Sequence, residues 1–143
     1  MEVNFQLQPI DGEIIVVEDD PLLREIMAEI LADVGAQCVA FPNAEDALVY
    51  MLGSGTKCSL VIADHGLPGQ LQGAEFVSMV QSRWPEIPAI VTSGWTDHFI
   101  GLPPNTRFLP KPWPVDGLVK AVAELLQPGV PVNEKPPPPK DEA

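Results

Sequence analysis

Basic residues are scarce in this sequence of 143 residues, where 8 lysines and arginines stand against 20 aspartates and glutamates. The net charge of −12 at pH 7 repels nucleic-acid phosphates and anionic lipids, so we expect no direct contact with nucleic acid and no membrane binding. The charge balance still permits binding of metal cations, of basic protein surfaces, or of proteins that contact an apolar patch.

Long apolar runs and cysteine motifs are missing as well. No run approaches the roughly 20 apolar residues that cross a bilayer, and residues 1–13 lack the basic start and apolar stretch of a secretory signal. Cys38 and Cys58 have neither CxxC spacing nor histidine companions, which favours buried, unreacted thiols over a metal site. We therefore expect a cytoplasmic protein.

The sequence does contain a regular alternation of short apolar runs and longer segments with helical periodicity. The apolar runs predict five strands, at residues 14–17, 38–41, 60–63, 89–92 and 107–109. Amphipathic helices are expected after the first, second, third and fifth strands, and Asp20 and Pro21 supply the cap and first residue of the first helix. Because parallel strands need crossover helices, the alternation predicts an α/β fold with a doubly wound, five-stranded parallel sheet.

The two ends of the chain lack this alternation. The last segment, "PGVPVNEKPPPPKDEA", contains six prolines and cannot pack a core. We expect residues 128–143 to form a Pro-rich disordered tail, with a polyproline ligand for a partner domain as the alternative. Residues 1–12 are expected to be an N-terminal extension, which leaves one folded domain over residues 13–127.

Polar side chains follow four of the predicted strands. Glu18 and Asp19 come after the first strand and Asp64 after the third. Ser93 and Lys111 follow the fourth and fifth strands. Ligands bind at the carboxyl ends of the strands in such sheets, so these side chains are expected to converge. Three carboxylates in one crevice would repel or protonate unless a hard cation lay among them, and an oxygen-only site suits Mg²⁺.

Such a site could carry a phosphoryl group. Asp64, in "LVIADHGLPG", can attack phosphorus, Lys111, in "FLPKPW", can offset the developing charge, and a hydroxyl in "IVTSG" can bond a phosphoryl oxygen. Taken singly, these residues also fit ordinary roles as acidic helix caps, turn residues and a surface lysine. Their common order, each directly after a predicted strand, favours the site.

Four segments, "VVEDDPLLR", "LVIADHGLPG", "IVTSG" and "FLPKPW", resemble in order and approximate spacing the motifs of the response-regulator receiver domain of bacterial two-component signalling. The resemblance covers residues 13–127 and implies a flavodoxin-like fold. It implies a phosphoacceptor that takes a phosphoryl group on Asp64 from a histidine kinase or phosphotransfer protein and requires Mg²⁺. Such a protein is not an enzyme beyond self-catalysed phosphorylation and slow autodephosphorylation, and it signals through contacts with a downstream protein that the sequence does not name.

The resemblance assigns roles to single residues. Asp64 resembles the phosphoacceptor, and Lys111 resembles the family's lysine, whose bond to the following proline is often cis. Asp19 resembles the direct Mg²⁺ ligand and Glu18 the acid that acts through water. The backbone carbonyl of Gly66 resembles the third protein ligand of the metal.

Further roles fall near the ends of the fourth and fifth strands. Ser93 resembles the switch hydroxyl, with Thr92 as the competing assignment, and Gly94 resembles the small residue that admits phosphodonors. Trp95 lies two residues past Ser93, at a position where, by the same resemblance, the family's side chains influence how quickly water reaches the acyl phosphate. Phe108 resembles the aromatic residue that swings inward on activation.

The segment between Ser93 and Lys111 departs from the family pattern. It has 17 residues, and Gly101, Pro103 and Pro104 interrupt helical continuity, so the fourth helix is expected to be truncated or missing. The family's common output and dimerisation face lies there, which leaves open the mode of output and a possible homodimer. The chain is expected to be a stand-alone, single-domain receiver.

Two rival hypotheses remain. A hydrolase that forms an aspartyl phosphate in an α/β fold would place a DxD pair after the first strand, whereas residues 18–20 are Glu-Asp-Asp. A receiver-like interaction module that works without phosphorylation is the main alternative, because the fourth-helix segment is altered. A Mg²⁺-dependent response to phosphodonors separates this module from a phosphoacceptor.

Overall fold

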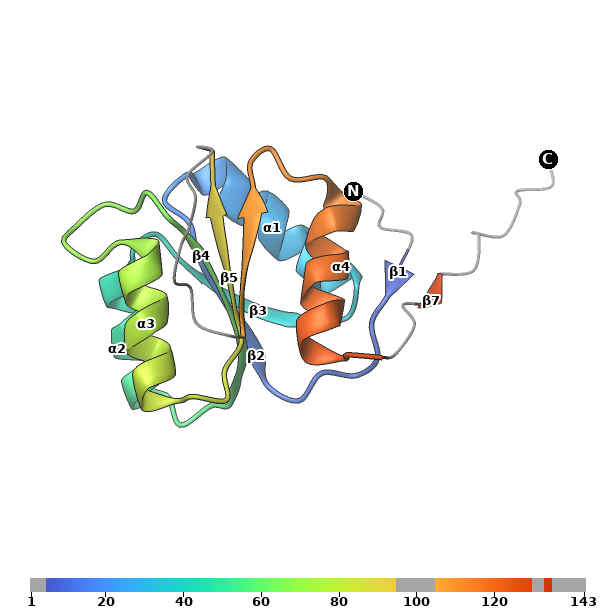
Figure 1. Cartoon of the computed structure of the whole chain (residues 1–143), viewed down its shortest axis with the longest axis horizontal. Coiled ribbons are helices and arrows are strands. Elements are labelled where there is room, and N and C mark those ends of the chain that lie inside the picture. Colours follow the sequence, from blue (N-terminus) through green and yellow to red (C-terminus); the bar gives the residue numbers. More distant parts are fainter. Residues whose placement is uncertain (1–4, 95–104, 130–132, 135–143) are drawn as a thin grey trace.

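The computed structural model describes residues 5–94, 105–129 and 133–134 (Figure 1). Five parallel strands form the central sheet in the order β3-β2-β4-β5-β6, which confirms the predicted fold class. These strands are β2 (Glu13–Val17), β3 (Gln37–Phe41), β4 (Cys58–Asp64), β5 (Ala89–Ser93) and β6 (Thr106–Pro110). The strand order reverses between β2 and β4, so the carboxyl ends of these two strands border the switch point where such sheets bind ligands.

Helices cover both faces of the sheet, with α1 and α4 on one face and α2 and α3 on the other (Figure 1). The helices are α1 (Pro21–Asp33), α2 (Ala44–Gly53), α3 (Gly73–Arg83) and α4 (Val115–Leu126). Side chains alternate between the two faces along β2. Ile14 and Val16 therefore pack in the core under α1 and α4, whereas Ile15 and Val17 pack in the core under α2 and α3.

Side-chain caps start the first two helices close to the carboxyl edge of the sheet. Asp20, the expected cap of α1, accepts the N–H of Leu22 at 2.9 Å through Oδ1. Asn43 accepts the N–H of Asp46 at 2.7 Å and caps α2 in the same way. Each cap satisfies a backbone donor that the first helical turn leaves without a partner. The caps therefore fix where the loops after β2 and β3 end.

The segment before β2 is tied to the domain, although we predicted it as an extension. β1 (Phe5–Gln6) pairs with β7 (Asn133–Glu134) in an antiparallel, two-residue ladder that the sequence does not predict. Leu7 is buried in the core beside α1 and α4, and its N–H donates to the Val34 carbonyl at 3.1 Å. This segment therefore packs against the C-terminal end of α1, where it donates a hydrogen bond to the cap residue Val34.

A second contact holds the same segment to the end of α4. The N–H of Gln8 donates to Gln127 Oε1 at 3.1 Å, and Gln127 Nε2 donates back to the Gln8 carbonyl at 2.7 Å.

Two other expectations concern the ends of the chain and the fourth helix. Of the predicted tail, the structure describes residues 128–129 and β7, and β7 pairs with β1. The expected truncation of the fourth helix falls on residues 95–104 and lies outside the described residues. No helix in the described part of the chain is long and apolar enough to cross a membrane.

Cys38 and Cys58 are free, half-buried thiols on β3 and β4. Burial raises the pKa of each thiol to about 11. Because the thiolate is the reactive form, we expect both cysteines to react at pH 8 about 100-fold more slowly than they do in the unfolded chain. A chromogenic disulfide reagent, used with and without denaturant, measures both rates. Equal rates in the two conditions would contradict this expectation.

Candidate functional site

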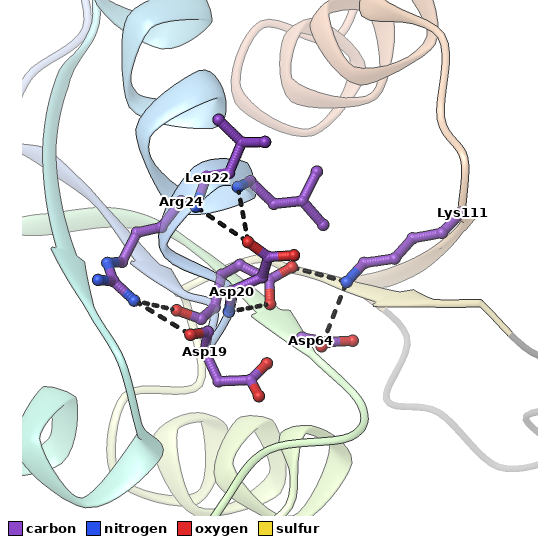
Figure 2. A network of polar contacts seen from close by, with 8 residues as sticks. Asp19, Asp20, Leu22, Arg24, Asp64 and Lys111 are labelled. Atoms are coloured by element: carbon purple, nitrogen blue, oxygen red, sulfur yellow. Dashed lines mark hydrogen bonds and ion pairs between the residues drawn. The ribbon is translucent and has the colours of Figure 1, made fainter.

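Three strands deliver the charged side chains of the site to one edge of the sheet. Glu18 follows β2, Asp64 ends β4, and Lys111 follows β6. Lys111 Nζ lies 2.6 Å from Glu18 Oε1 and 3.2 Å from Asp64 Oδ2 (Figure 2). These residues are far apart in the sequence and meet because the carboxyl ends of parallel strands share one edge. The convergence expected from the sequence is present in the structure.

The acidic cluster combines buried and exposed carboxylates. Glu18, Asp19 and Asp64 each place a carboxylate oxygen within 4.8 Å of the others. Glu18 is 1% exposed and Asp64 is 9% exposed, whereas Asp19 faces solvent. With the Lys111 amine, the cluster carries two more negative than positive charges when every group is ionised. Oxygen ligands with one solvent-facing side suit Mg²⁺, which keeps several of its waters, so the residues present fit the ion.

The pKa values of Glu18 and Lys111 are both raised, for different physical reasons. Burial raises the pKa of Glu18 above its ordinary value, and the hydrogen bonds from Lys111 and from the Asp20 N–H offset this only in part, while the Asp64 charge adds to the rise. Burial alone would lower the pKa of Lys111, but the hydrogen bond and charge of Glu18, followed by those of Asp64, raise it. The amine therefore stays protonated at neutral pH.

Arg24 holds the main chain that carries the acidic pair, a role that the sequence analysis missed. Its Nη1 donates to the Glu18 carbonyl at 2.8 Å and lies 3.5 Å from the Asp19 carbonyl (Figure 2). The Asp20 N–H donates to Glu18 Oε2 at 3.2 Å. The three consecutive acids thus have separate roles, because Asp20 caps α1 whereas Glu18 and Asp19 belong to the acidic cluster. The sequence shows the arginine in "VVEDDPLLR" but not which backbone groups it bonds.

The end of the connection between β4 and α3 packs against the main chain of Asp64 and His65. The N–H of Gly73, the first residue of α3, donates to the His65 carbonyl at 3.2 Å. A Cβ on Gly73 would lie 2.1 Å from the Asp64 carbonyl oxygen, so only glycine permits this approach. Gly66, the expected carbonyl ligand, lies in this connection and is exposed.

The end of β5 places two hydroxyl residues beside the site. Thr92 is 1% exposed and is the register partner of Asp64, and Ser93 is 2% exposed. The N–H of Lys111 donates to the Ser93 carbonyl at 2.7 Å, which ties β5 to the β6–α4 loop. Ser93 as the switch hydroxyl, with Thr92 as its competitor, stays a prediction.

The other predicted residues at this edge have simple locations. Gly94 follows β5 and is exposed, whereas Trp95 lies outside the described residues. Phe108 lies in β6, half-buried, with Val91 of β5 as its register partner. The peptide bond after Lys111 is cis. The roles of these residues in phosphoryl access and switching remain predictions.

An apolar groove of about 500 Å³ opens beside Lys111. Its walls include Leu23 and Ile26 of α1 together with Trp113 and Val115 at the start of α4. The sequence did not reveal this groove, because its two walls come from segments far apart in the sequence. The groove places apolar surface next to the acidic cluster.

Comparison with known proteins agrees with this geometry. The family described as "Response regulator receiver domain" matches residues 14–123. The hydrogenase transcriptional regulatory protein HoxA of Cupriavidus necator is 29% identical over 119 residues, which cover 80% of this chain and 24% of that protein. The DNA-binding transcriptional regulator NtrC of Salmonella typhimurium is 28% identical, over 80% of this chain and 25% of that protein. The chain thus spans about a quarter of the length of these relatives.

Solved structures give the same result. The signal receiver domain of an HD domain-containing protein from Pseudomonas fluorescens Pf-5 superposes with a TM-score of 0.74 at 22% identity, covering 82% of this chain and 96% of that chain. The response regulator TrrA from Thermotoga maritima, solved with Mg²⁺ and BeF, has a TM-score of 0.71 at 28% identity, covering 80% and 98%. The resemblance seen in the sequence is therefore confirmed, and this chain belongs to the response-regulator receiver domain family.

Proposed function

We propose that this receiver domain accepts a phosphoryl group on Asp64 from the phosphohistidine of a histidine kinase or phosphotransfer protein, with Mg²⁺ as cofactor. The observation that carries this proposal is the meeting of three carboxylates and one amine at a single edge of the sheet. Receiver domains bind Mg²⁺ at an acidic pocket, and the cluster of Glu18, Asp19 and Asp64 has that composition.

In the proposed reaction, a carboxylate oxygen of Asp64 attacks the phosphorus atom while the bond from phosphorus to the donor's imidazole nitrogen breaks. The product is an acyl phosphate on Asp64 and a free histidine on the donor. Lys111, held 3.2 Å from Asp64 Oδ2, offsets negative charge as the phosphoryl group arrives. Mg²⁺, held by Glu18, Asp19, Asp64 and the Gly66 carbonyl, would neutralise charge on the phosphoryl oxygens.

The acyl phosphate would alter the balance of contacts at the edge. It carries about 1.5 to 2 negative charges where the Asp64 carboxylate carried one, beside Lys111, which is already bonded to Glu18. Ser93 would donate its hydroxyl to a phosphoryl oxygen, and Phe108 would move with the end of β5. Conversion of an almost wholly inactive population to an active one takes about 5.5 kcal/mol. A partial shift of the population is therefore the expected response.

Phosphodonor docking is proposed at the apolar groove beside Lys111. Leu22, on the first turn of α1 and adjacent in the sequence to the groove wall residue Leu23, is 64% exposed. A partner that covers Leu22 and the groove would bring its histidine close to Asp64. We further propose a cytoplasmic location and output through contacts with a downstream protein or with a second copy of the chain.

A beryllofluoride titration tests the proposed function. Beryllofluoride mimics a phosphoryl group on a carboxylate, and Trp113 lines the groove beside Lys111, so its fluorescence is expected to change on binding. We expect a saturable change that requires Mg²⁺ and disappears when the ion is chelated. Acetyl phosphate with Mg²⁺ should add one phosphoryl group, detected by intact mass. A protein that stays folded and gives neither result would favour the interaction module that works without phosphorylation.

A further inference from the structure

The loop over residues 65–72 joins β4 to α3 and contains Gly66, the proposed carbonyl ligand of the metal. A loop has no ladder of backbone hydrogen bonds, so its shape depends on individual contacts. Gln72 supplies one of them, because its Oε1 accepts the Leu67 N–H at 3.2 Å and its Nε2 donates to the Leu67 carbonyl at 2.9 Å. Leu67 itself is buried in the core under α2 and α3.

The second half of the loop is held from outside by Glu45, on the first turn of α2. Its Oε1 accepts the N–H of Gln70 at 3.2 Å and the N–H of Leu71 at 3.0 Å. The neighbouring Gly69 has a φ of +89°, and a Cβ there would lie 2.9 Å from Glu45 Oε1 and 3.0 Å from Oε2. Residues 69–71 therefore all contact the Glu45 carboxylate. This carboxylate occupies the space that a side chain at residue 69 would need.

The charge state of Glu45 suits this contact. Hydrogen bonds from its own N–H, from Leu71 and from Gln70 lower the pKa of Glu45 below its ordinary value. The carboxylate is therefore ionised at neutral pH, and charge-assisted hydrogen bonds to backbone N–H groups are stronger than neutral ones. The contact joins α2 to the loop that follows the phosphoacceptor.

We propose that Glu45 is a positioning residue for the metal site. By holding residues 69–71 it fixes the loop that presents the Gly66 carbonyl, and it thereby raises the affinity for Mg²⁺. This inference rests on the proposed function, because it takes Gly66 as a ligand. Partners that hold a metal ligand in place typically contribute about 10-fold or more to metal affinity.

The chain offers a matched control on the same helical turn. Asp46 carries the same charge and is also an acid of the first turn of α2, so it interacts equally with the helix dipole. Its side chain and its N–H both bond Asn43, at 3.2 Å through Oδ2 and at 2.7 Å through the N–H. Asp46→Ala therefore removes a carboxylate near the site without removing the contact to the loop.

The experiment measures Mg²⁺ affinity by calorimetry for the whole chain and for Glu45→Ala, Glu45→Gln and Asp46→Ala. We expect Glu45→Ala to raise the Mg²⁺ dissociation constant about 10-fold and Asp46→Ala to leave it within about 2-fold of the original. Glu45→Gln should retain most of the affinity, because its amide oxygen can accept both backbone hydrogen bonds. Without metal, the backbone amides of Gln70 and Leu71 should exchange hydrogen faster in Glu45→Ala than in the original chain. Asp46→Ala and Glu45→Gln should not show this increase.

Each outcome decides the inference. Equal Mg²⁺ affinities for Glu45→Ala and Asp46→Ala would overturn it, even with faster exchange at Gln70 and Leu71. Absence of Mg²⁺ binding in the original chain would overturn the proposed function, and the inference with it. If Glu45→Ala does not fold, Gly69→Ala replaces it, because the added Cβ displaces the carboxylate, and an unchanged Mg²⁺ affinity in that variant would equally contradict the proposal.

Discussion

Asp64→Asn is expected to reduce phosphoryl incorporation from acetyl phosphate by at least about 100-fold, because an amide oxygen is a poor nucleophile for phosphorus. The side chain keeps its size at the end of β4, so the fold should be retained. Loss of the 3.2 Å ion pair to Lys111 is offset by relief of repulsion within the acidic cluster. Intact mass after incubation with acetyl phosphate and Mg²⁺ measures the effect.

Asp11→Asn is the control for that experiment. Asp11→Asn is the same chemical change, made in an exposed ion pair with Lys57. Lys57 directly precedes β4, whereas Asp64 ends that strand, so the change lies away from the site. Its phosphoryl incorporation should equal that of the original chain. Retention of incorporation in Asp64→Asn, with a phosphoryl group mapped to another residue, would refute the assignment of the phosphoacceptor.

Lys111→Met is expected to lower the free energy of unfolding of the metal-free protein by about 3 kcal/mol, because it leaves the carboxylate of Glu18 buried without its cation. The figure lies at the low end for a broken buried pair, since the Lys111 side chain is 19% exposed and Glu18 can take up a proton. Urea unfolding in the presence of a chelator measures this loss.

The pH dependence of that loss follows from Glu18. Its pKa is already raised in the folded protein, and removal of the amine raises it further. A carboxyl group with a raised folded pKa contributes stability below its unfolded pKa, and this stability is lost as the pH rises through the folded value. The Lys111→Met defect should therefore be smaller at pH 5 than at pH 8.

Two variants test this explanation. Adding Glu18→Gln to Lys111→Met should recover much of the stability, because the buried charge is gone. Lys57→Met removes the exposed partner of Asp11 and should change the free energy of unfolding by less than about 1 kcal/mol, as for surface ion pairs. A Lys111→Met protein as stable as Lys57→Met would show that the buried pair does not stabilise the fold.

The sheet and the main charged residues of the site could be predicted because they follow from local patterns. Apolar runs identified the strands, and the parallel sheet then required Glu18, Asp64 and Lys111 to meet, since each follows a strand. Asp20 was separable from its acidic neighbours because a cap followed by proline has a position of its own. These inferences need only the spacing of residues along the chain.

The supporting contacts could not be predicted in this way. Arg24 and Glu45 bond backbone groups, and backbone groups leave no mark in the sequence. Their partners depend on the direction of a side chain across a loop, which periodicity does not describe. The pairing of β1 with β7 has the same origin, since two residues are too few for an alternating pattern.

The clasp between Gln8 and Gln127 determines how the domain can be held without hindrance. It lies where α1 and α4 finish, at the amino ends of the strands, whereas Asp64 stands at their carboxyl ends. A dye or a surface linker attached through a cysteine placed at Gln8 or Gln127 would therefore sit at the end of the sheet opposite Asp64. Immobilised there, the domain keeps the proposed phosphoacceptor on the side away from the support.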